Sequence, residues 1–420
     1  MNTFAIIVAS FLVVDFALQS LADYLNSRSA GRAVAPILAG LYDDESQERM
    51  VSHIRAATRL ALAERACLLL VLLTFWFLGG FSFLEELVSE NLAGLIPRGL
   101  AYAGAVAAGY ALLETPFDAY STFVVEERFG FNRTTLRTFV ADRIKVMLLA
   151  AVVGAIVLSG VLFLFFRLGD MAWLVCWAFV VLFSVGVQLI APVLILPLFN
   201  RFEPMTDGKL KDEILAYTRS VSYAVEDVFV MDGSRRSTKG NAFFTGFGKH
   251  RRIALYDTLV DAHPVDEIVS VLAHEVGHYK KQHVVRALIV GALHTGAVLF
   301  VFSLVVDWPV LYAAFGLSGP SLATGLVCFA IAVSPIESMV AIGLNAISRR
   351  HEYEADRFAV STAPEPAALR QAMLRLSRGH LSNPNPHRLY VLLNYSHPPL
   401  KSRLATLESE LSAAQSGWTE

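Results

Sequence analysis

The apolar and polar positions divide this chain into long apolar runs and two polar segments. Seven runs are long enough to cross a bilayer as helices, namely residues 3–21, 66–83, 95–113, 145–166, 172–195, 285–306 and 321–347. The first run contains Asp15, begins without a basic region and ends without a small-residue cleavage site, so we interpret it as a span and not as a signal peptide. The pattern therefore predicts an all-α membrane protein with about seven transmembrane helices.

The two polar segments cover residues 200–284 and 348–420. The first predicts a helix near 207–223, a strand near 227–231 and a second strand at 252–258, where apolar and polar residues alternate. We therefore expect four parts. Residues 1–199 hold the first five spans, 200–284 a segment with a small β element, 285–347 the last two spans, and 348–420 a C-terminal segment.

Composition agrees with this division, because 55% of the residues are hydrophobic and only 17% are charged. An ordinary soluble domain is less apolar and carries more charge. The net charge of −2 does not favour a nucleic-acid partner. Cys67, Cys176 and Cys328 lie far apart in apolar stretches, and we interpret them as buried thiols, neither disulfides nor metal ligands.

Basic residues predict the orientation of the chain. The loops after spans one, three and five and the tail after span seven are rich in Lys and Arg, whereas residues 81–94 and 307–320 contain neither. Basic loops favour the cytoplasmic side of a membrane. We therefore expect an outside N-terminus, a cytoplasmic C-terminus and both polar segments in the cytoplasm.

The strongest chemical pattern lies at residues 271–279, which read VLAHEVGHY and place His274, Glu275 and His278 as H-E-x-x-H. On a helix, positions i and i+4 share a face, so both imidazoles point to the same place. Two neutral imidazoles can hold zinc, and the glutamate can take a proton from a water that the metal polarises. Pro264 and an acidic first turn predict a helix that starts there and runs straight into the sixth span.

A catalytic zinc takes three protein ligands, so the site needs one more. Residues 351–359, HEYEADRFA, directly follow the seventh span. On a helix Glu352 and Asp356 share a face, so Glu352 is a candidate ligand and Asp356 a candidate to orient a ligand histidine through its other ring nitrogen. Glu354 and His351 compete for the ligand role, and a solvated charged helix end is the alternative without function.

A second histidine lies in residues 395–400, YSHPPL, with Arg403 just beyond. The prolines hold the backbone of His397 extended. A fixed histidine beside an arginine can stabilise the oxyanion of a tetrahedral intermediate. An ordinary turn before the last helix is the alternative, and the residues alone favour it.

Together these motifs resemble the CAAX prenyl endopeptidases of the a-factor-converting type, a family of integral-membrane zinc metalloproteases. The resemblance rests on H-E-V-G-H at 274–278, E-Y-E-A-D at 352–356, G-N-A-F-F-x-G-F at 240–247 and S-H-P-P-L-x-x-R-L at 396–404. Three further stretches agree: L-P-L-F-N-R-F-E-P at 196–204, G-K-L-K at 208–211 and E-E-R-F-G-F-N at 126–132. Seven motifs in one order make the resemblance specific.

The resemblance implies a role for each candidate residue. One Zn²⁺ per chain would be bound by His274, His278 and Glu352, with Asp356 behind a ligand. The catalytic residues would be Glu275, His397 and Arg403. Asn241, Ala242 and Phe243 would form an extended edge that pairs with the substrate backbone, as strand addition does elsewhere; a simple turn at Asn241 is the alternative.

The resemblance further implies spans that enclose a chamber, with a zincin-like site at its cytoplasmic end. The implied activity is hydrolysis of C-terminal CaaX-type peptides, prenylated ones among them, or of membrane-associated proteins. Removal of misfolded membrane proteins without prenyl dependence is an alternative. Two rivals of other classes are a transporter with an incidental H-E-x-x-H and a zinc-binding scaffold that does not need Glu275.

The substrate partner is therefore expected to be a peptide or protein, and the lipid bilayer is the second partner. The composition, rich in Ala, Leu and Arg, favours a bacterial inner membrane. The endoplasmic reticulum membrane is the expectation for a eukaryotic chain.

Overall fold

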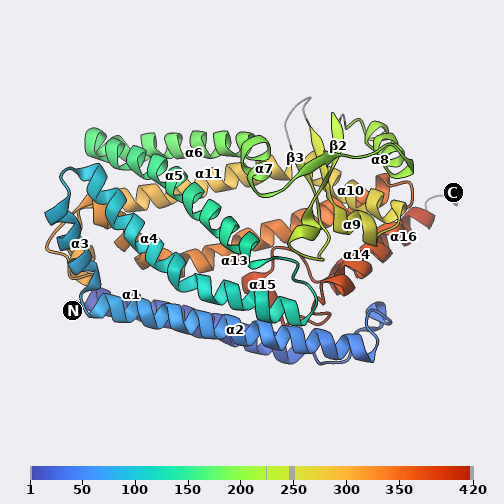
Figure 1. Cartoon of the computed structure of the whole chain (residues 1–420), viewed down its shortest axis with the longest axis horizontal. Coiled ribbons are helices and arrows are strands. Elements are labelled where there is room, and N and C mark those ends of the chain that lie inside the picture. The colour runs from blue at the N-terminus through green and yellow to red at the C-terminus, as the bar shows by residue number, and fades with distance from the viewer. Residues whose placement is uncertain (1, 224, 246–250, 417–420) are drawn as a thin grey trace.

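The computed structural model describes residues 2–223, 225–245 and 251–416, and these residues are mostly helical. Figure 1 shows long helices along one half of the molecule and a small sheet with short helices at the other end. The first helix begins at the end farthest from the sheet, and the last described helix lies beside the sheet. The last two residues of the 240–247 motif lie outside the described residues.

The long half contains seven long helices and the short ones between them: α1 (Thr3–Ser29), α2 (Asp44–Phe77), α3 (Gly80–Asn91), α4 (Leu95–Tyr120), α5 (Leu136–Leu168), α6 (Ala172–Ile190), α7 (Leu196–Phe199), α11 (His283–Val305), α12 (Pro309–Ala314) and α13 (Leu322–Thr362). Each predicted span lies mainly on one of the long helices, although the second, 66–83, extends past the end of α2 at Phe77 into α3. Asn2 and Thr135 cap α1 and α5 by accepting backbone N–H groups.

Five stretches are long and apolar enough to cross a membrane, namely Thr3–Ser29, Asp44–Phe77, Leu136–Phe199, His283–Val305 and Leu322–Thr362. The third contains both α5 and α6, which Gly169 separates with a positive φ of 54°. Helix α4 covers the predicted third span but is not among the five. The protein is thus a multi-pass helical membrane protein, and the count of seven spans stays a prediction.

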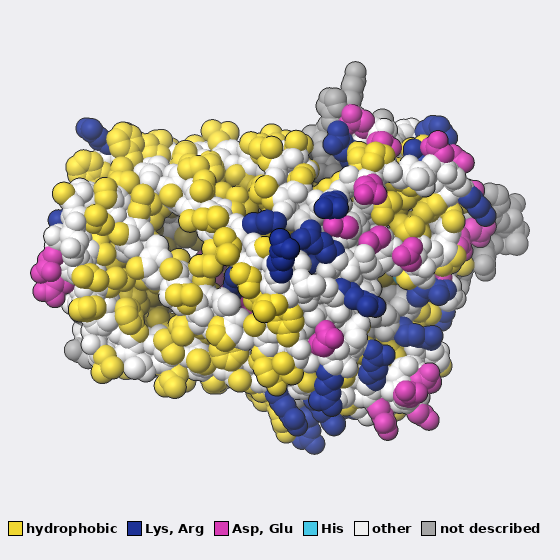
Figure 2. All heavy atoms as spheres, in the orientation of Figure 1, with side chains coloured by type: hydrophobic (Ala, Val, Ile, Leu, Met, Phe, Trp, Pro, Cys, Tyr) yellow, Lys and Arg dark blue, Asp and Glu magenta, His cyan; other side chains and the backbone are white. Residues whose placement is uncertain are grey.

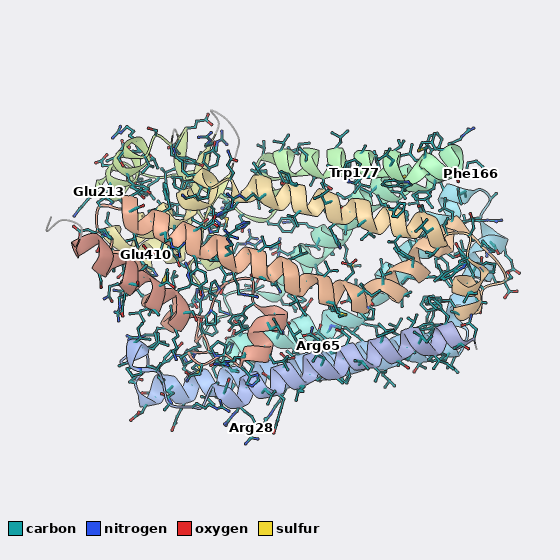
Figure 3. All side chains as sticks on the ribbon, turned by 180° about the vertical axis from the view of Figure 1, so that it is seen from behind. Arg28, Arg65, Phe166, Trp177, Glu213 and Glu410 are labelled. Atoms are coloured by element: carbon teal, nitrogen blue, oxygen red, sulfur yellow. The ribbon has the colours of Figure 1, made fainter. Side chains whose placement is uncertain are left out.

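The surface reflects the same division. Figure 2 shows the long half covered by hydrophobic side chains, with Lys and Arg side chains gathered where this half meets the mixed surface of the other end. In Figure 3, Phe166 and Trp177 lie along the long helices, Glu213 and Glu410 lie at the opposite end, and Arg28 and Arg65 lie between them. Exposed apolar side chains such as Leu182, with 72% exposure, are what a lipid-facing surface requires.

The compact end is built on a four-stranded sheet of β1 (Phe202–Pro204), β2 (Asp227–Met231), β3 (Ala242–Thr245) and β4 (Arg252–Tyr256), in the order β1-β2-β4-β3. Strands β2 and β4 are parallel, and the other pairs are antiparallel. The strands predicted at 227–231 and 252–258 are present, the second two residues shorter. Strand β3 forms an edge.

The remaining helices are α8 (Lys209–Ser220), α9 (Asp257–Ala262), α10 (Val265–Lys280), α14 (Ala368–Gly379), α15 (Arg388–Asn394) and α16 (Leu400–Ser416). Ile253 and Leu255 of β4 share a core with Leu272 and Val276 of α10, all fully buried. Burying each such side chain contributes about 1.5–3 kcal/mol, so this contact fixes α10 against the sheet.

One expectation about α10 is wrong. The H-E-x-x-H helix does not run straight into the sixth span, because α10 ends at Lys280 and α11 begins at His283. Gln282 lies between them with a left-handed φ of 57°. A left-handed residue ends the hydrogen-bonding path of a right-handed helix, so the chain changes direction before it enters the span.

Helix α13 is continuous over 41 residues and contains Pro335. Figure 3 shows the helix bent. Proline inside a helix removes one backbone hydrogen bond and produces such bends. The predicted seventh span and the segment with Glu352 therefore belong to one helix that extends from the apolar half to the sheet end.

Candidate active site

Helix α10 carries the H-E-x-x-H residues, and contacts of its first turn hold its N-terminal end in place. Asp266 and Glu267 lie in its first turn, where the helix dipole favours anions. Glu267 is buried, accepts both Nε and Nη2 of Arg375 and lies 2.7 Å from Nδ1 of His263. Because this end is fixed, the positions of His274, Glu275 and His278 along the helix are fixed too.

A glycine allows α13 to approach this helix closely. A Cβ atom added at Gly277 would lie 3.0 Å from Cα of Ala355 and 3.1 Å from its carbonyl oxygen. Ala355 itself is fully buried. The backbones of α10 and α13 therefore meet at Gly277, and this contact brings Glu352 next to the two histidines.

Three ligand atoms converge at this contact. Nε2 of His274 and Nε2 of His278 are 3.1 Å apart. The carboxylate oxygens of Glu352 lie 3.5 Å from the first nitrogen and 3.4 Å from the second. The competing candidates are engaged elsewhere: Glu354 contacts His283, and the ring of His351 stacks on that of His283. Among the described residues, His274, His278 and Glu352 form the His/Cys/Asp/Glu group that can hold a metal ion.

The donor set fits a zinc-type ion. Tetrahedral ligands about 2.0–2.2 Å from one ion lie about 3.3 Å from each other, close to the separations seen here. Oε2 of Glu352 is buried and makes no hydrogen bond to a described residue, although Nη1 of Arg403 lies 3.4 Å from it as an ion pair. A buried carboxylate oxygen without a donor is costly, and a bound cation would satisfy it.

The other nitrogen of His274 is held by Asp356. Nδ1 lies 2.8 Å from Oδ1 of Asp356, which leaves Nε2 free to face the metal position. Arg403 donates from Nε and Nη2 to the two oxygens of the same carboxylate, at 2.9 and 2.6 Å. Its Nη1 also lies 3.4 Å from Oε2 of Glu352. Arg403 thus holds the carboxylate behind the ligand.

Charge around His274 favours its protonated form when no metal is bound. Burial alone lowers the pKa of His274, but the carboxylates of Asp356 and Glu352 raise it to about 9. Metal ligands must be neutral, so binding of a metal at this position releases a proton. A cation bound here would therefore replace a buried proton.

The remaining catalytic candidates line a cavity of about 840 Å³ beside these ligands. Its walls include Glu275, His397, Asn241 and Ala242. His397 is 67% exposed, and its Nε2 lies 3.3 Å from Oε1 of Glu352. Its Nδ1 lies 3.0 Å from Oγ of Ser396. The ligand candidates His274 and Glu352 therefore line the same cavity as Glu275 and His397.

Strand β3 supplies one wall of this cavity with unpaired backbone. The N–H of Tyr256 donates to Asn241, and the register pairs Phe243 with Ala254. Alternate residues of an antiparallel edge strand turn their N–H and C=O groups away from the neighbouring strand, so the backbone of Ala242 faces outward. The N–H of Ala242 donates a hydrogen bond to the side-chain Oδ1 of Asn241 at 2.9 Å.

The sequence patterns did not identify Gly277, Lys239, His380 or His283. Gly277 is visible within H-E-V-G-H, but only the packing shows why it is glycine. Lys239 and His380 line the cavity from segments far from any metal motif. His283 is five residues after His278, which on a continuous helix is about 140° away from it, so no helical pattern connects the two.

Comparisons with known proteins match the two parts of the chain to two family descriptions. Residues 23–201 match the family described as CAAX prenyl protease N-terminal, five membrane helices. Residues 204–411 match peptidase family M48.

The chain is 30% identical to CAAX prenyl protease 1 of Saccharomyces cerevisiae over 435 residues, which cover 96% of this chain and 95% of that protein. It is 37% identical to the CAAX prenyl protease 1 homolog of Arabidopsis thaliana over 312 residues, 74% of this chain and 73% of the other. The crystal structure of S. mikatae Ste24p aligns with a TM-score of 0.92 at 30% identity, over 97% of this chain and 100% of the other.

Proposed function

This chain belongs to the M48 peptidase family and, within it, to the CAAX prenyl proteases, and from that premise we propose that it removes C-terminal residues from CaaX-type substrates. It is a membrane metalloprotease. The observation that carries the proposal is the convergence of His274, His278 and Glu352 beside an open cavity that also contains Glu275.

We propose zinc as the metal, one ion per chain, held by His274, His278 and Glu352. Zinc bound there would polarise a water and the scissile carbonyl. Glu275 then takes the proton of the attacking water and passes it to the leaving amine. His397 donates a hydrogen bond to the oxyanion of the tetrahedral intermediate. Arg403, which the resemblance places among the catalytic residues, is proposed here to keep Asp356, and through it His274, in place.

The substrate backbone is held by β3 in this proposal. The outward N–H and C=O groups of Ala242 offer main-chain hydrogen bonds to an extended peptide. Asn241 accepts the N–H of Ala242 until a substrate arrives, and Phe243 holds the strand in the sheet. A peptide added at this edge passes through the cavity that contains Glu275 and His397.

We propose that the spans enclose a water-filled chamber. Ionisable side chains lie partly exposed within the long helices, where lipid contact would be costly. Nε2 of His294 lies 2.9 Å from Oε2 of Glu337, with exposures of 32% and 39%. Water at these groups accounts for their exposure better than lipid does.

The division into residues 1–199, 200–284, 285–347 and 348–420 is kept as part of this proposal. The Lys and Arg side chains at the border of the apolar half support an active site on the cytoplasmic side. We propose the inner membrane for a bacterial chain and the endoplasmic reticulum membrane for a eukaryotic one.

The test compares purified wild type with Glu275→Gln in detergent. Bound zinc is measured first, and then cleavage of a farnesylated CaaX peptide and its unprenylated counterpart. We expect zinc in both proteins and a loss of kcat by a factor of about 10² to 10⁴ in the variant, because glutamine cannot take the proton.

Each other outcome supports a different function. Equal cleavage of the two peptides would favour removal of misfolded membrane proteins over prenyl-dependent processing. Zinc without cleavage in wild type would favour the scaffold. Wild type without zinc would contradict the proposal and return the chain to the transporter class.

A further inference from the structure

His283, the first residue of α11, lies between a metal-ligand candidate, His278, and the partly buried carboxylate of Glu354. Its side chain is 4% exposed. Its Nδ1 lies 3.1 Å from Nδ1 of His278, and its Nε2 lies 3.1 Å from Oε2 of Glu354. The ring stacks on that of His351 at 4.1 Å between centroids, with 11° between the planes. Both ring nitrogens are therefore engaged, and the ring cannot rotate freely.

The hydrogen bonds allow one consistent placement of protons. His278 must present the lone pair of Nε2 to the metal, so its Nδ1 carries the proton. That N–H needs an acceptor, and Nδ1 of His283 is at hydrogen-bond distance. A neutral His283 that accepts at Nδ1 carries its own proton on Nε2 and donates it to Glu354.

Glu354 is fixed at the far end of this chain of contacts. Arg286 donates from Nη1 to Oε2 at 3.1 Å, and Arg350 donates from Nε to Oε1 at 3.2 Å. Glu354 also lies two residues after Glu352, so α13 supplies a metal-ligand candidate from one face and this carboxylate from another. The orientation of His283 is thus set from α13 as well as from α11.

We propose that His283 is a positioning residue for the metal, which fixes the tautomer and the ring orientation of His278. The proposal rests on the proposed function, because it requires His278 to be a metal ligand. In the same way Asp356 holds His274 and Arg403 holds Asp356. Each ligand histidine is then held by its own chain of contacts. His274 is linked through Asp356 to Arg403. His278 is linked through His283 and Glu354 to Arg286 and Arg350.

The turn at Gln282 explains how His283 reaches His278. Its left-handed conformation rotates the start of α11 relative to α10, and His283 turns back towards the ligand. This break between the helices therefore serves the metal site as well as entry into the membrane.

The test measures zinc affinity by competition with a chelator, without any peptide substrate. His283→Phe keeps a flat ring beside His351 but removes the acceptor for His278. His283→Asn places an amide oxygen near the position of Nδ1 and can restore that acceptor. His351→Phe is the control, because it keeps the stacked ring and changes no contact to His278.

We expect His283→Phe to weaken zinc binding by a factor of about 10 to 100, the usual effect of losing a partner behind a metal ligand. His283→Asn and His351→Phe should stay within a few fold of wild type. The absorption spectrum of the Co²⁺-substituted protein should change in His283→Phe and not in His351→Phe.

Three results would overturn the inference: wild-type zinc affinity in His283→Phe, the same loss in His283→Asn as in His283→Phe, or the same loss in His351→Phe. Melting of the metal-free proteins separates a folding defect from a lost contact, because the inference requires that His283→Phe and His351→Phe melt alike. A wild type that binds zinc but cleaves no CaaX peptide would contradict the proposed substrate without contradicting the role of His283.

Discussion

His397 differs from the metal-ligand candidates in its exposure. Its side chain is 67% exposed, whereas that of Glu352 is 7% exposed. The two prolines after it hold its backbone extended, and its ring lies at the rim of the cavity beside Glu352. A residue in this position can touch a bound substrate while contributing little to the packing of the fold.

We therefore expect His397→Ala to lower kcat by a factor of about 10² to 10³, the usual effect of removing one donor to an oxyanion. Zinc content and melting temperature should remain those of wild type, because the ring is exposed. Steady-state kinetics with the farnesylated peptide, together with metal analysis, would check this. A wild-type kcat would show that His397 belongs to an ordinary turn, the alternative that its residues alone favour.

The contact between α10 and α13 determines the metal site at the level of whole elements. His274 and His278 come from α10, and Glu352 comes from α13. Their ligand atoms meet because Gly277 has no side chain to separate the two backbones. The site therefore depends on a residue that touches no metal.

Gly277→Ala should destabilise the protein by about 1–3 kcal/mol, the usual cost of an extra methyl group in a packed contact. It should also lower zinc affinity, because α13 must move away from the histidines. Gly343→Ala in α13 is the matched control, since its added Cβ meets nothing within 4 Å. Thermal melting and chelator competition would measure both effects, and equal behaviour of the two variants would argue against the close contact.

Strand β3 gives a second prediction at this scale. Ala242→Pro removes an N–H that faces outward, whereas Phe243→Pro removes one that faces β4. We expect Ala242→Pro to keep its melting temperature and to lose kcat/KM by about fivefold, since one hydrogen bond contributes about 1 kcal/mol. Phe243→Pro should instead melt earlier.

A wild-type kcat/KM for the Ala242→Pro variant would contradict the proposal that β3 binds the substrate backbone. Asn241→Ala separates the side chain from the backbone. It should have a smaller effect, because it takes away only the acceptor for the N–H of Ala242.

The elements were largely predictable from the sequence, and their contacts were not. Apolar runs located all the long helices, and alternation located β2 and β4. The left-handed Gln282 was not predictable, because residues 280–283 contain no glycine, asparagine or proline to mark the end of a helix. The choice between Glu352, Glu354 and His351 likewise depends on how α10 and α13 pack against each other. Residue spacing along one helix does not determine that packing.

At the scale of the whole molecule, an apolar half meets a polar half at a border of basic side chains (Figure 2). Within the apolar half, His294 and Glu337 form a pair on α11 and α13 that is partly exposed. In a bilayer such groups either face water or pair within protein. The proposed chamber makes them face water.

Cysteines introduced at His294 and Glu337 should react with a charged maleimide when the protein is in nanodiscs. The background would lack the native Cys67, Cys176 and Cys328. A cysteine at Leu182, which is 72% exposed on the apolar surface, is the control and should not react, because lipid covers it. Unreactive cysteines at both 294 and 337 would contradict a water-filled chamber.

In the sequence, the two histidines of the candidate metal site come before the last membrane helices, and Glu352 comes near the end of them. His278 precedes α11, and Glu352 follows the bend of α13, with residues 283–347 between them. During biosynthesis the ribosome releases the H-E-x-x-H segment long before Glu352. The third ligand can reach the histidines only after α11 and α13 have been inserted side by side. With the ligand set proposed above, a newly made chain can therefore complete its metal site only once these helices are in the membrane.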